Sequence, residues 1–375
     1  MRLGICGWSQ SGKSIVFDCL TSASKGAGPA EHAAPGKARI GASHVPDERL
    51  DYLATIFKPK KITYALVEYI DLPGLVADAH AHDTNPKILG DVRQADALIA
   101  VVRAFENDSV ASPFDTVDPV RDWNRLWDEL IFADLEVADK RIKRLEVDVT
   151  KPTTTQKENE LELGVLRRVK AALEEGHGAS TAKMSDIEEK AVRGFRFLTA
   201  KPILVIANLG EESLGKPSKY SDADLANRAT GRNSIAACPD FGRATMSMFA
   251  KLEAELSELP EEERVAFMAD LGLEKLVATE VVKKGYEILD LVSFLTAGDK
   301  EVRAWTISRG TPAVEAAGVI HSDIQRGFIR AEITAYEDFK ALGSFKEARA
   351  KGKLRLEGKE YVMKDGDIVE FRFSV

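Results

Sequence analysis

The sequence predicts an α/β protein with a mostly parallel sheet, an inserted helical hairpin and a small mixed domain of strands around a helix. Three observations support this fold class. Apolar runs of strand length recur between helical stretches, the segment from 123 to 198 has helical spacing, and strict apolar–polar alternation appears at the end of the chain. Each pattern has the period of one kind of element, so the order of the patterns gives the order of the elements.

Four apolar runs have the length of buried strands. A strand covered on both faces is apolar at nearly every position, which is typical of a parallel sheet flanked by helices. A helix is predicted to begin at Ser14, directly after the first run. The four predicted strands are Leu3–Cys6, Leu66–Ile70, Ala97–Val102 and Leu204–Ala207.

The segment from 123 to 198 predicts two helices that pack along each other. Its apolar residues recur at alternating four- and three-residue steps, which is the spacing of a helical seam. They are Ile131, Leu135, Ala138, Ile142 and Leu145, followed after a break at Pro152 by Leu166, Val169 and Leu173. The basic residues between them form either a solvated face, which we favour, or an RNA-binding surface. These residues are Arg141, Lys143, Arg144, Arg167, Arg168 and Lys170.

The C-terminal segment changes character again. Val369, Phe371 and Phe373 alternate with polar residues, as in a half-buried strand, and Asp365-Gly366 before them is a turn signal. Ala313–Ile320 predicts one helix. We therefore divide the chain into a first domain in two parts, 1–122 and 199–284, the inserted hairpin at 123–198 and a last domain at 285–375.

Composition excludes several functional classes. The 375 residues are 44% hydrophobic and 30% charged, and no apolar run is long enough to cross a membrane. The net charge of −8 argues against DNA as a partner. Residues 3–6 already have the character of a buried strand, so we expect no signal peptide. Three cysteines without metal spacing predict reduced thiols in the cytoplasm, with Cys6 and Cys19 in the core.

The residues that carry chemistry begin at the end of the first predicted strand. Residues 7–14 read Gly-Trp-Ser-Gln-Ser-Gly-Lys-Ser, which is the pattern of a loop that cradles phosphates. Gly7 and Gly12 let successive N–H groups face a β-phosphate at a helix N-terminus. Lys13 supplies a cation for the β- and γ-phosphates, and the Ser14 hydroxyl is a predicted Mg²⁺ ligand. We therefore predict that the chain binds a purine nucleoside triphosphate with magnesium.

Two further segments complete the predicted site. Asp71-Leu72-Pro73-Gly74 ends the second predicted strand, where Asp71 would hold magnesium through water and the Gly74 N–H would meet the γ-phosphate. Asn208-Leu209-Gly210-Glu211 ends the fourth, where guanine-specific proteins have Asn-Lys-x-Asp. The longer Glu211 carboxylate misplaces its oxygens for guanine, so we expect a weakened preference for guanine. Backbone groups near Phe249 and Ala250 are a further expected influence on the base.

The chain resembles the YchF family of Obg-like ATPases almost from end to end. The motifs that carry the resemblance are Gly7–Ser14, Val45-Pro46-Asp47, Asp71–Val76, Arg103–Asp108, Asn208–Glu211, Phe294–Gly298, Lys300–Thr306, Gly327–Glu332 and Lys364–Asp367. The resemblance implies a P-loop GTPase-like domain, an inserted coiled coil and a C-terminal TGS domain of the β-grasp type. It also implies binding and slow hydrolysis of ATP in preference to GTP, and association with ribosomes or ribosomal RNA.

The chain departs from the family pattern around the γ-phosphate. Pro35 replaces a magnesium-binding Thr, residues 77–86 contain no glycine where the second switch is normally glycine-rich, and Ile15 replaces a Thr after the phosphate loop. Ser112 stands where some members are thought to use a catalytic His. His80 and His82 are compatible with a metal pair or with two surface histidines, and we favour the second.

These departures leave three functional hypotheses. The chain is a slow ATPase, a nucleotide-binding scaffold that hardly hydrolyses, or a GTP-specific GTPase; we favour the first. Leu75 stands where many GTPases have a water-orienting Gln. The predicted catalytic residues are Lys13, Asp71, Gly74 and Ser112, and the predicted metal ligands are Ser14 and Asp71. The predicted nucleotide-binding residues are Gly7, Gln10, Ser11, Gly12, Lys13, Ser14, Ile15, Asn208, Leu209, Glu211, Phe249 and Ala250.

Overall fold

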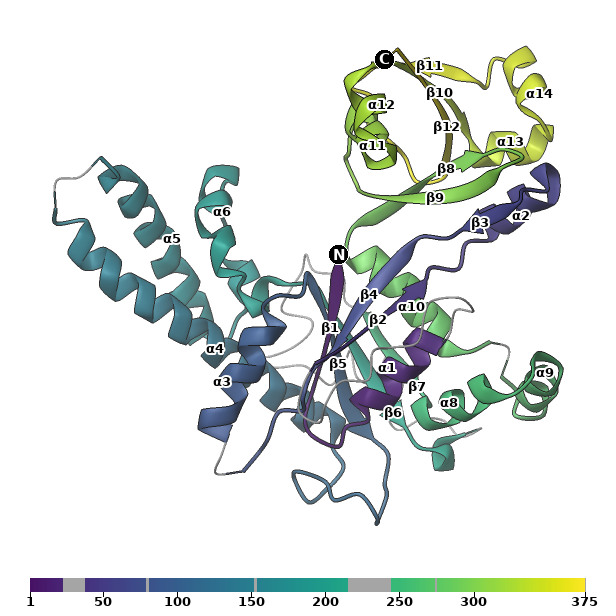
Figure 1. Ribbon diagram of the computed structural model, residues 1–375. Helices are drawn as coiled ribbons and strands as arrows, with labels where there is room; N and C mark the ends of the chain where they lie inside the picture. Colours follow the sequence, from purple (N-terminus) through teal and green to yellow (C-terminus); the bar gives the residue numbers. More distant parts are fainter. Residues whose placement is uncertain (23–37, 79–80, 152–153, 215–243, 274, 375) are drawn as a thin grey trace. The chain divides into compact units, whose positions relative to one another are not determined.

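The computed structural model describes residues 1–22, 38–78, 81–151, 154–214, 244–273 and 275–374 (Figure 1). These residues form two compact units. The first unit contains residues 1–22, 38–42 and 68–281, and the second contains 43–67 and 282–374. Each unit has its own six-stranded sheet.

The sheet of the first unit has the order β2-β4-β1-β5-β6-β7. Its central strand β1 pairs in parallel with β4 and β5, and β6 and β7 continue in the same direction. The bounds are β1 (Arg2–Cys6), β2 (Arg39–His44), β4 (Leu66–Asp71), β5 (Ala97–Ala104), β6 (Ile203–Leu209) and β7 (Ala244–Met248). All eight residues of β5 are buried, as expected for an apolar strand covered on both faces. The prediction of a mostly parallel sheet built on four apolar strands is confirmed.

Helices flank this sheet. They are α1 (Lys13–Ser22), α3 (Ala81–Val92), α8 (Ala250–Glu258), α9 (Glu261–Asp270) and α10 (Val277–Ile288), the last of which crosses into the second unit. The buried Glu253 carboxylate of α8 accepts from the backbone N–H groups of Val277 and Ala278 at the start of α10, while burial raises its pKa to about 7. Cys6 and Cys19 are buried free thiols, as predicted, and Cys238 lies outside the described residues.

The predicted helical pair is confirmed as α4 (Pro119–Asp148) and α5 (Gln156–Glu174), which run side by side (Figure 1). Asp118 caps α4 by accepting from the N–H groups of Val120 and Arg121, and Pro119 fits the first turn because it needs no donor there. Seam residues such as Ala138 and Leu166 are fully buried. A short helix, α6 (Asp186–Val192), follows.

Four of the six basic residues singled out in this segment are bound by acidic side chains. Arg141 forms two hydrogen bonds to Glu162, at 2.6 and 2.7 Å, and Lys170 lies 2.6 Å from Asp139. Arg167 and Arg168 pair with Glu146 and Glu188. These ion pairs fit the solvated face that we favoured, because they occupy the charges that an RNA backbone would need.

The second unit is a mixed sheet around one helix, with the order β11-β10-β12-β8-β9-β3. Its core lies between this sheet and α11 (Ala313–Ile320), the helix predicted with the same bounds. The strands are β3 (Lys61–Thr63), β8 (Leu291–Ala297), β9 (Glu301–Ser308), β10 (Phe328–Ala335), β11 (Arg355–Glu357) and β12 (Asp367–Phe373). The remaining helices are α2 (Glu48–Phe57), α12 (Ser322–Arg326), α13 (Tyr336–Leu342) and α14 (Phe345–Ala350).

Residues 43–67 join the second unit although they lie early in the sequence. Arg49 donates to Asp365 at 2.7 Å and also pairs with Asp47 at 2.8 Å. Strand β3 adds to the edge of the sheet by parallel pairing with β9. The division at 122, 198 and 284 remains a prediction. Within the described residues, no helix combines the length and the apolar character needed to cross a membrane.

Candidate nucleotide-binding site

The loop between β1 and α1 has a backbone that only glycine permits at two positions. Gly7 has a φ of 149° and Gly12 a φ of 90°. A Cβ at Gly7 would lie 2.4 Å from the Val101 carbonyl oxygen, and a Cβ at Gly12 would lie 2.1 Å from Asn208 Nδ2. The loop therefore packs tightly against the ends of β5 and β6. Gln10, with a φ of 63°, is also left-handed, a conformation that costs a non-glycine residue about 1–2 kcal/mol.

Lys13 begins α1, and its ammonium is buried inside the loop. Its Nζ donates to the Trp8 carbonyl oxygen at 3.0 Å. A Cβ at Gly74 would lie 2.8 Å from Nζ, so the ammonium lies against the segment that follows β4. Burial lowers the pKa of Lys13, and the nearby Asp71 carboxylate opposes this shift. An ammonium carries three N–H donors, which suits it to bind several phosphate oxygens at once.

The segment after β4 is hydrogen-bonded directly to the loop. The Ser9 N–H donates to the Leu75 carbonyl at 2.8 Å, and the Leu75 N–H donates to the Gly7 carbonyl at 3.0 Å. The Leu75 side chain is 1% exposed and packs in the core of the unit. Leu75 therefore anchors the segment and does not present a side chain to the site.

Asp71 ends β4 and is held by an arginine that sequence reasoning missed. Arg39, on β2, donates from Nε at 3.0 Å and from Nη2 at 2.8 Å to Asp71 Oδ2. Its Nη2 also reaches the Ser14 carbonyl oxygen at 3.2 Å, and Nη1 reaches Asp18 at 2.9 Å. No motif contains Arg39, so only its place four residues after Pro35 could have drawn attention to it.

The donors at this point fit a magnesium ion. Asp71 is 5% exposed, and its second oxygen, Oδ1, is buried with no hydrogen-bond partner among the described residues. A buried carboxylate oxygen without a partner is unfavourable and suits a hard cation or its bound water. Ser14 is exposed at the start of α1, on the residue that follows Lys13. The Ser11 hydroxyl, also buried, likewise has no partner among the described residues.

On the other side of the loop, Asn208 joins three segments. It is the second-to-last residue of β6, and its Nδ2 donates to the Ser11 carbonyl at 3.1 Å. Its Oδ1 accepts from the Ala250 N–H at 3.3 Å. The structure thus brings the loop and the segment at Phe249-Ala250 together around one amide.

Three other residues predicted to bind the nucleotide differ in exposure. Leu209 is buried in the core. Glu211 is exposed and forms an ion pair with Lys251 at 3.2 Å, so its carboxylate has a partner without a guanine. Ile15 is 38% exposed on α1.

Ser112 lies in the loop between β5 and α4. Its hydroxyl accepts from the Phe114 N–H at 3.4 Å and donates to the Thr116 carbonyl at 3.3 Å. The hydroxyl is therefore held within its own loop. Pro35 and His80 lie outside the described residues, and the side chain of His82 is not described. In the second switch segment, Asn85 exchanges two hydrogen bonds of 3.0 Å with the backbone of Val76.

Trp8 is a second feature that sequence reasoning missed. It is 5% exposed, and its indole N–H donates to the Asp122 carbonyl of α4 at 2.8 Å. Its ring meets Phe114 edge to face at 4.9 Å. The glycine loop is thus connected to the first turn of the helical pair through a residue that the loop pattern leaves unspecified.

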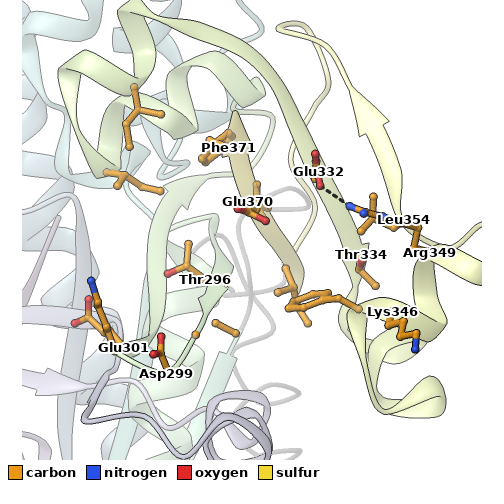
Figure 2. A pocket seen from close by; sticks show the side chains of 18 residues that line it. Thr296, Asp299, Glu301, Glu332, Thr334, Lys346, Arg349, Leu354, Glu370 and Phe371 are labelled. Carbon is orange, nitrogen blue, oxygen red and sulfur yellow. Dashed lines mark hydrogen bonds and ion pairs between the residues drawn. The ribbon is translucent and has the colours of Figure 1, made fainter. Parts of the chain in front are cut away.

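A separate cavity of about 680 Å³ lies in the second unit (Figure 2). Thr296, Thr334, Glu332 and Glu370 are among its lining residues, and Glu332 is bound by Arg349 at 3.1 Å (Figure 2). Arg372 holds the same carboxylate at 3.0 Å. The charge of Glu332 is therefore satisfied by arginines of its own unit.

The parallel sheet, the glycine loop with its buried lysine and the aspartate at the end of β4 define a P-loop protein of the GTPase-like class. Curated relatives match over the whole chain. They include proteins named "Ribosome-binding ATPase YchF" from Bacillus subtilis, 38% identical over 100% of both chains, and from Haemophilus influenzae, 38% identical over 100% of this chain and 99% of the relative. The chain belongs to the YchF family.

Two further comparisons agree. The solved structure of the Schizosaccharomyces pombe YchF GTPase is 29% identical, with a TM-score of 0.83, and the match covers 99% of this chain and 97% of that one. The family model YchF-GTPase_C, described as a protein of unknown function, matches residues 291–374. This range corresponds to most of the second unit.

Proposed function

We propose that this protein binds ATP, with GTP as the weaker ligand, together with Mg²⁺, and hydrolyses it slowly. The observation that carries the proposal is the buried Lys13 ammonium between the glycine loop and Gly74. Burying an ammonium is unfavourable unless anions complete its coordination, and a triphosphate supplies them. The names of the curated relatives support ATP as the nucleotide.

We assign the phosphates to the N–H groups of residues 7–14 and to Lys13. Ser14 and Asp71 would hold magnesium, which would neutralise charge that develops on the phosphates. The Gly74 N–H, beside Lys13, would meet the γ-phosphate. Asn208 would fix the loop that reads the base. Glu211 is a poor acceptor for guanine because its longer side chain misplaces the carboxylate oxygens, and Lys251 pairs with one of them.

Slow hydrolysis is expected because Leu75 stands where many GTPases have a water-orienting Gln. The Leu75 side chain is buried. Ser112 is the candidate for this role that the resemblance to the family implies. A positioned group of this kind contributes about a hundred- to ten-thousandfold, so we expect Ser112→Ala to reduce single-turnover hydrolysis of bound ATP by at least about a hundredfold. Thr116→Val, which leaves the Ser112 hydroxyl in place, is the matched control.

The same measurement decides between the enzyme and the scaffold. Turnover above the rate in buffer that falls in Ser112→Ala supports the slow ATPase with Ser112 in its site. Hydrolysis at the buffer rate with tight binding preserved would establish the scaffold that hardly hydrolyses. Stronger binding of GTP than ATP in the same protein would instead favour the GTP-specific alternative.

We further propose a regulatory, ribosome-associated role in the cytoplasm. Support comes from relatives whose names state ribosome binding. Lys143 and Arg144 are exposed on α4 and are the candidate contact residues, since the other four basic residues singled out in the sequence are bound by acidic ones.

We expect the protein to co-sediment with ribosomes in at least one nucleotide state. Replacing both Lys143 and Arg144 by Glu should weaken this association at least about tenfold, because electrostatic contacts to phosphates are lost. Substituting the ion-paired Arg167 is the control. Absence of co-sedimentation with ATP, with ADP and without nucleotide would refute the ribosomal role.

A further inference from the structure

The Arg39 guanidinium lies near the candidate metal ligands and is held by several contacts. Its guanidinium forms two hydrogen bonds to Asp71 Oδ2, one to Asp18 and one to the Ser14 carbonyl oxygen. The same group lies over the Phe17 ring, 4.5 Å from its centroid. A guanidinium has five N–H donors in a rigid fork, and four hydrogen bonds plus an aromatic face fix its position.

These contacts bring Arg39 to both residues predicted to hold magnesium. It binds Asp71 through one carboxylate oxygen and Ser14 through its backbone, while Asp71 Oδ1 remains without a partner among the described residues. One face of the carboxylate is thus neutralised by the protein itself, and the other remains for an external cation. A guanidinium stays protonated at every physiological pH, so this positive charge is permanent.

We propose that Arg39 is a resident cation of the triphosphate site that takes over part of the role of magnesium. This inference rests on the proposed ATP binding. Without metal, the guanidinium prevents Asp71 from repelling the phosphates. With metal, it competes for the same carboxylate and places a positive charge beside the ion. Both effects make ATP binding less dependent on magnesium than a site with Ser14 and Asp71 alone would be.

The test compares the dissociation constant of a fluorescent ATP analogue in excess magnesium and in EDTA. For the unmodified protein, we expect the two constants to agree within about tenfold. In Arg39→Gln, metal-free binding should weaken by about ten- to a hundredfold, since Asp71 then repels the phosphates, while binding with magnesium is retained or tightens. The ratio of the two constants therefore rises by at least about tenfold. Arg39→Lys, which keeps the charge but not the fork, should give an intermediate ratio.

Arg2→Gln is the matched control. Arg2 forms an arginine–carboxylate pair with Glu68 at 2.8 Å, but at the end of β1 opposite the glycine loop, so this variant should keep the unmodified ratio. A thermal melt without nucleotide verifies that Arg39→Gln is folded. An unchanged ratio in folded Arg39→Gln that binds ATP would overturn this inference alone. Absence of ATP binding by the unmodified protein in both conditions would overturn the proposed function and this inference with it.

Discussion

Lys13→Ala is expected to weaken ATP binding by about a thousandfold, to the limit of calorimetric detection. The ammonium is buried between the Trp8 carbonyl and Gly74, so a bound triphosphate would contact it away from water. Charge-assisted hydrogen bonds contribute about 1.5–3 kcal/mol each, and losing two of them corresponds to about a hundred- to ten-thousandfold in affinity. Isothermal titration calorimetry with ATP in excess magnesium measures the effect.

The fold should survive this substitution. Lys13 is a buried charge whose removal from the unliganded protein relieves a desolvation penalty. Among the described residues, its side chain forms a hydrogen bond only to a backbone oxygen. Lys143→Ala, at an exposed position on α4, is the control for a general effect of lost positive charge. If Lys13→Ala bound ATP within tenfold of the unmodified protein, the phosphates would have to lie elsewhere.

The parts of the site that sequence predicted are those encoded by consecutive residues. The glycine loop follows a strand and opens a helix, so its residue types and its geometry are set locally. The segments at Asp71 and Asn208 also follow apolar strands, and parallel strands bring their carboxyl ends to one edge of the sheet. The structure accordingly brings Lys13 to Gly74 and Asn208 to Ser11.

The parts that sequence missed depend on tertiary contacts without a local pattern. Arg39 reaches Asp71 only because β2 lies beside β4 in the sheet, and one arginine on an edge strand carries no periodic or motif signal. Trp8 occupies a variable position of the loop pattern, yet it contacts α4, 114 residues away in sequence. Residues 43–67 pack with the second unit because a β-strand can pair with any open sheet edge. The sequence of β3 alone, or of β9 alone, does not show which residues of the two strands pair.

Asp134→Ala is expected to destabilise the first unit by about 3–5 kcal/mol, the largest stability effect that we predict. The Asp134 side chain, on α4, is fully buried. Its carboxylate accepts from the N–H groups of Leu198 at 2.9 Å and Thr199 at 2.8 Å, and from the Thr199 hydroxyl at 2.7 Å. Arg93 pairs with the same group at 2.6 Å. Alanine would leave the buried donors of Leu198 and Thr199 without this acceptor, and each such group carries a desolvation penalty. The mostly buried Arg93 guanidinium would lose its charge partner and keep only hydrogen bonds to the Ala133 and Arg196 carbonyl oxygens among the described residues.

Urea unfolding followed by tryptophan fluorescence measures this effect, because Trp123 and Trp127 lie on α4 within the same core. Asp139→Ala, on the same helix, is the matched control. Asp139 pairs with Lys170 at the surface, where such a pair contributes about 0–1 kcal/mol. Asp134→Asn keeps one carbonyl acceptor but loses the charge, so it should fall between the two. A loss below about 1 kcal/mol in Asp134→Ala would mean that α4 is held to the turn at Leu198–Ala200, which leads into β6, by apolar packing alone. This carboxylate would then not anchor the helical pair to the sheet.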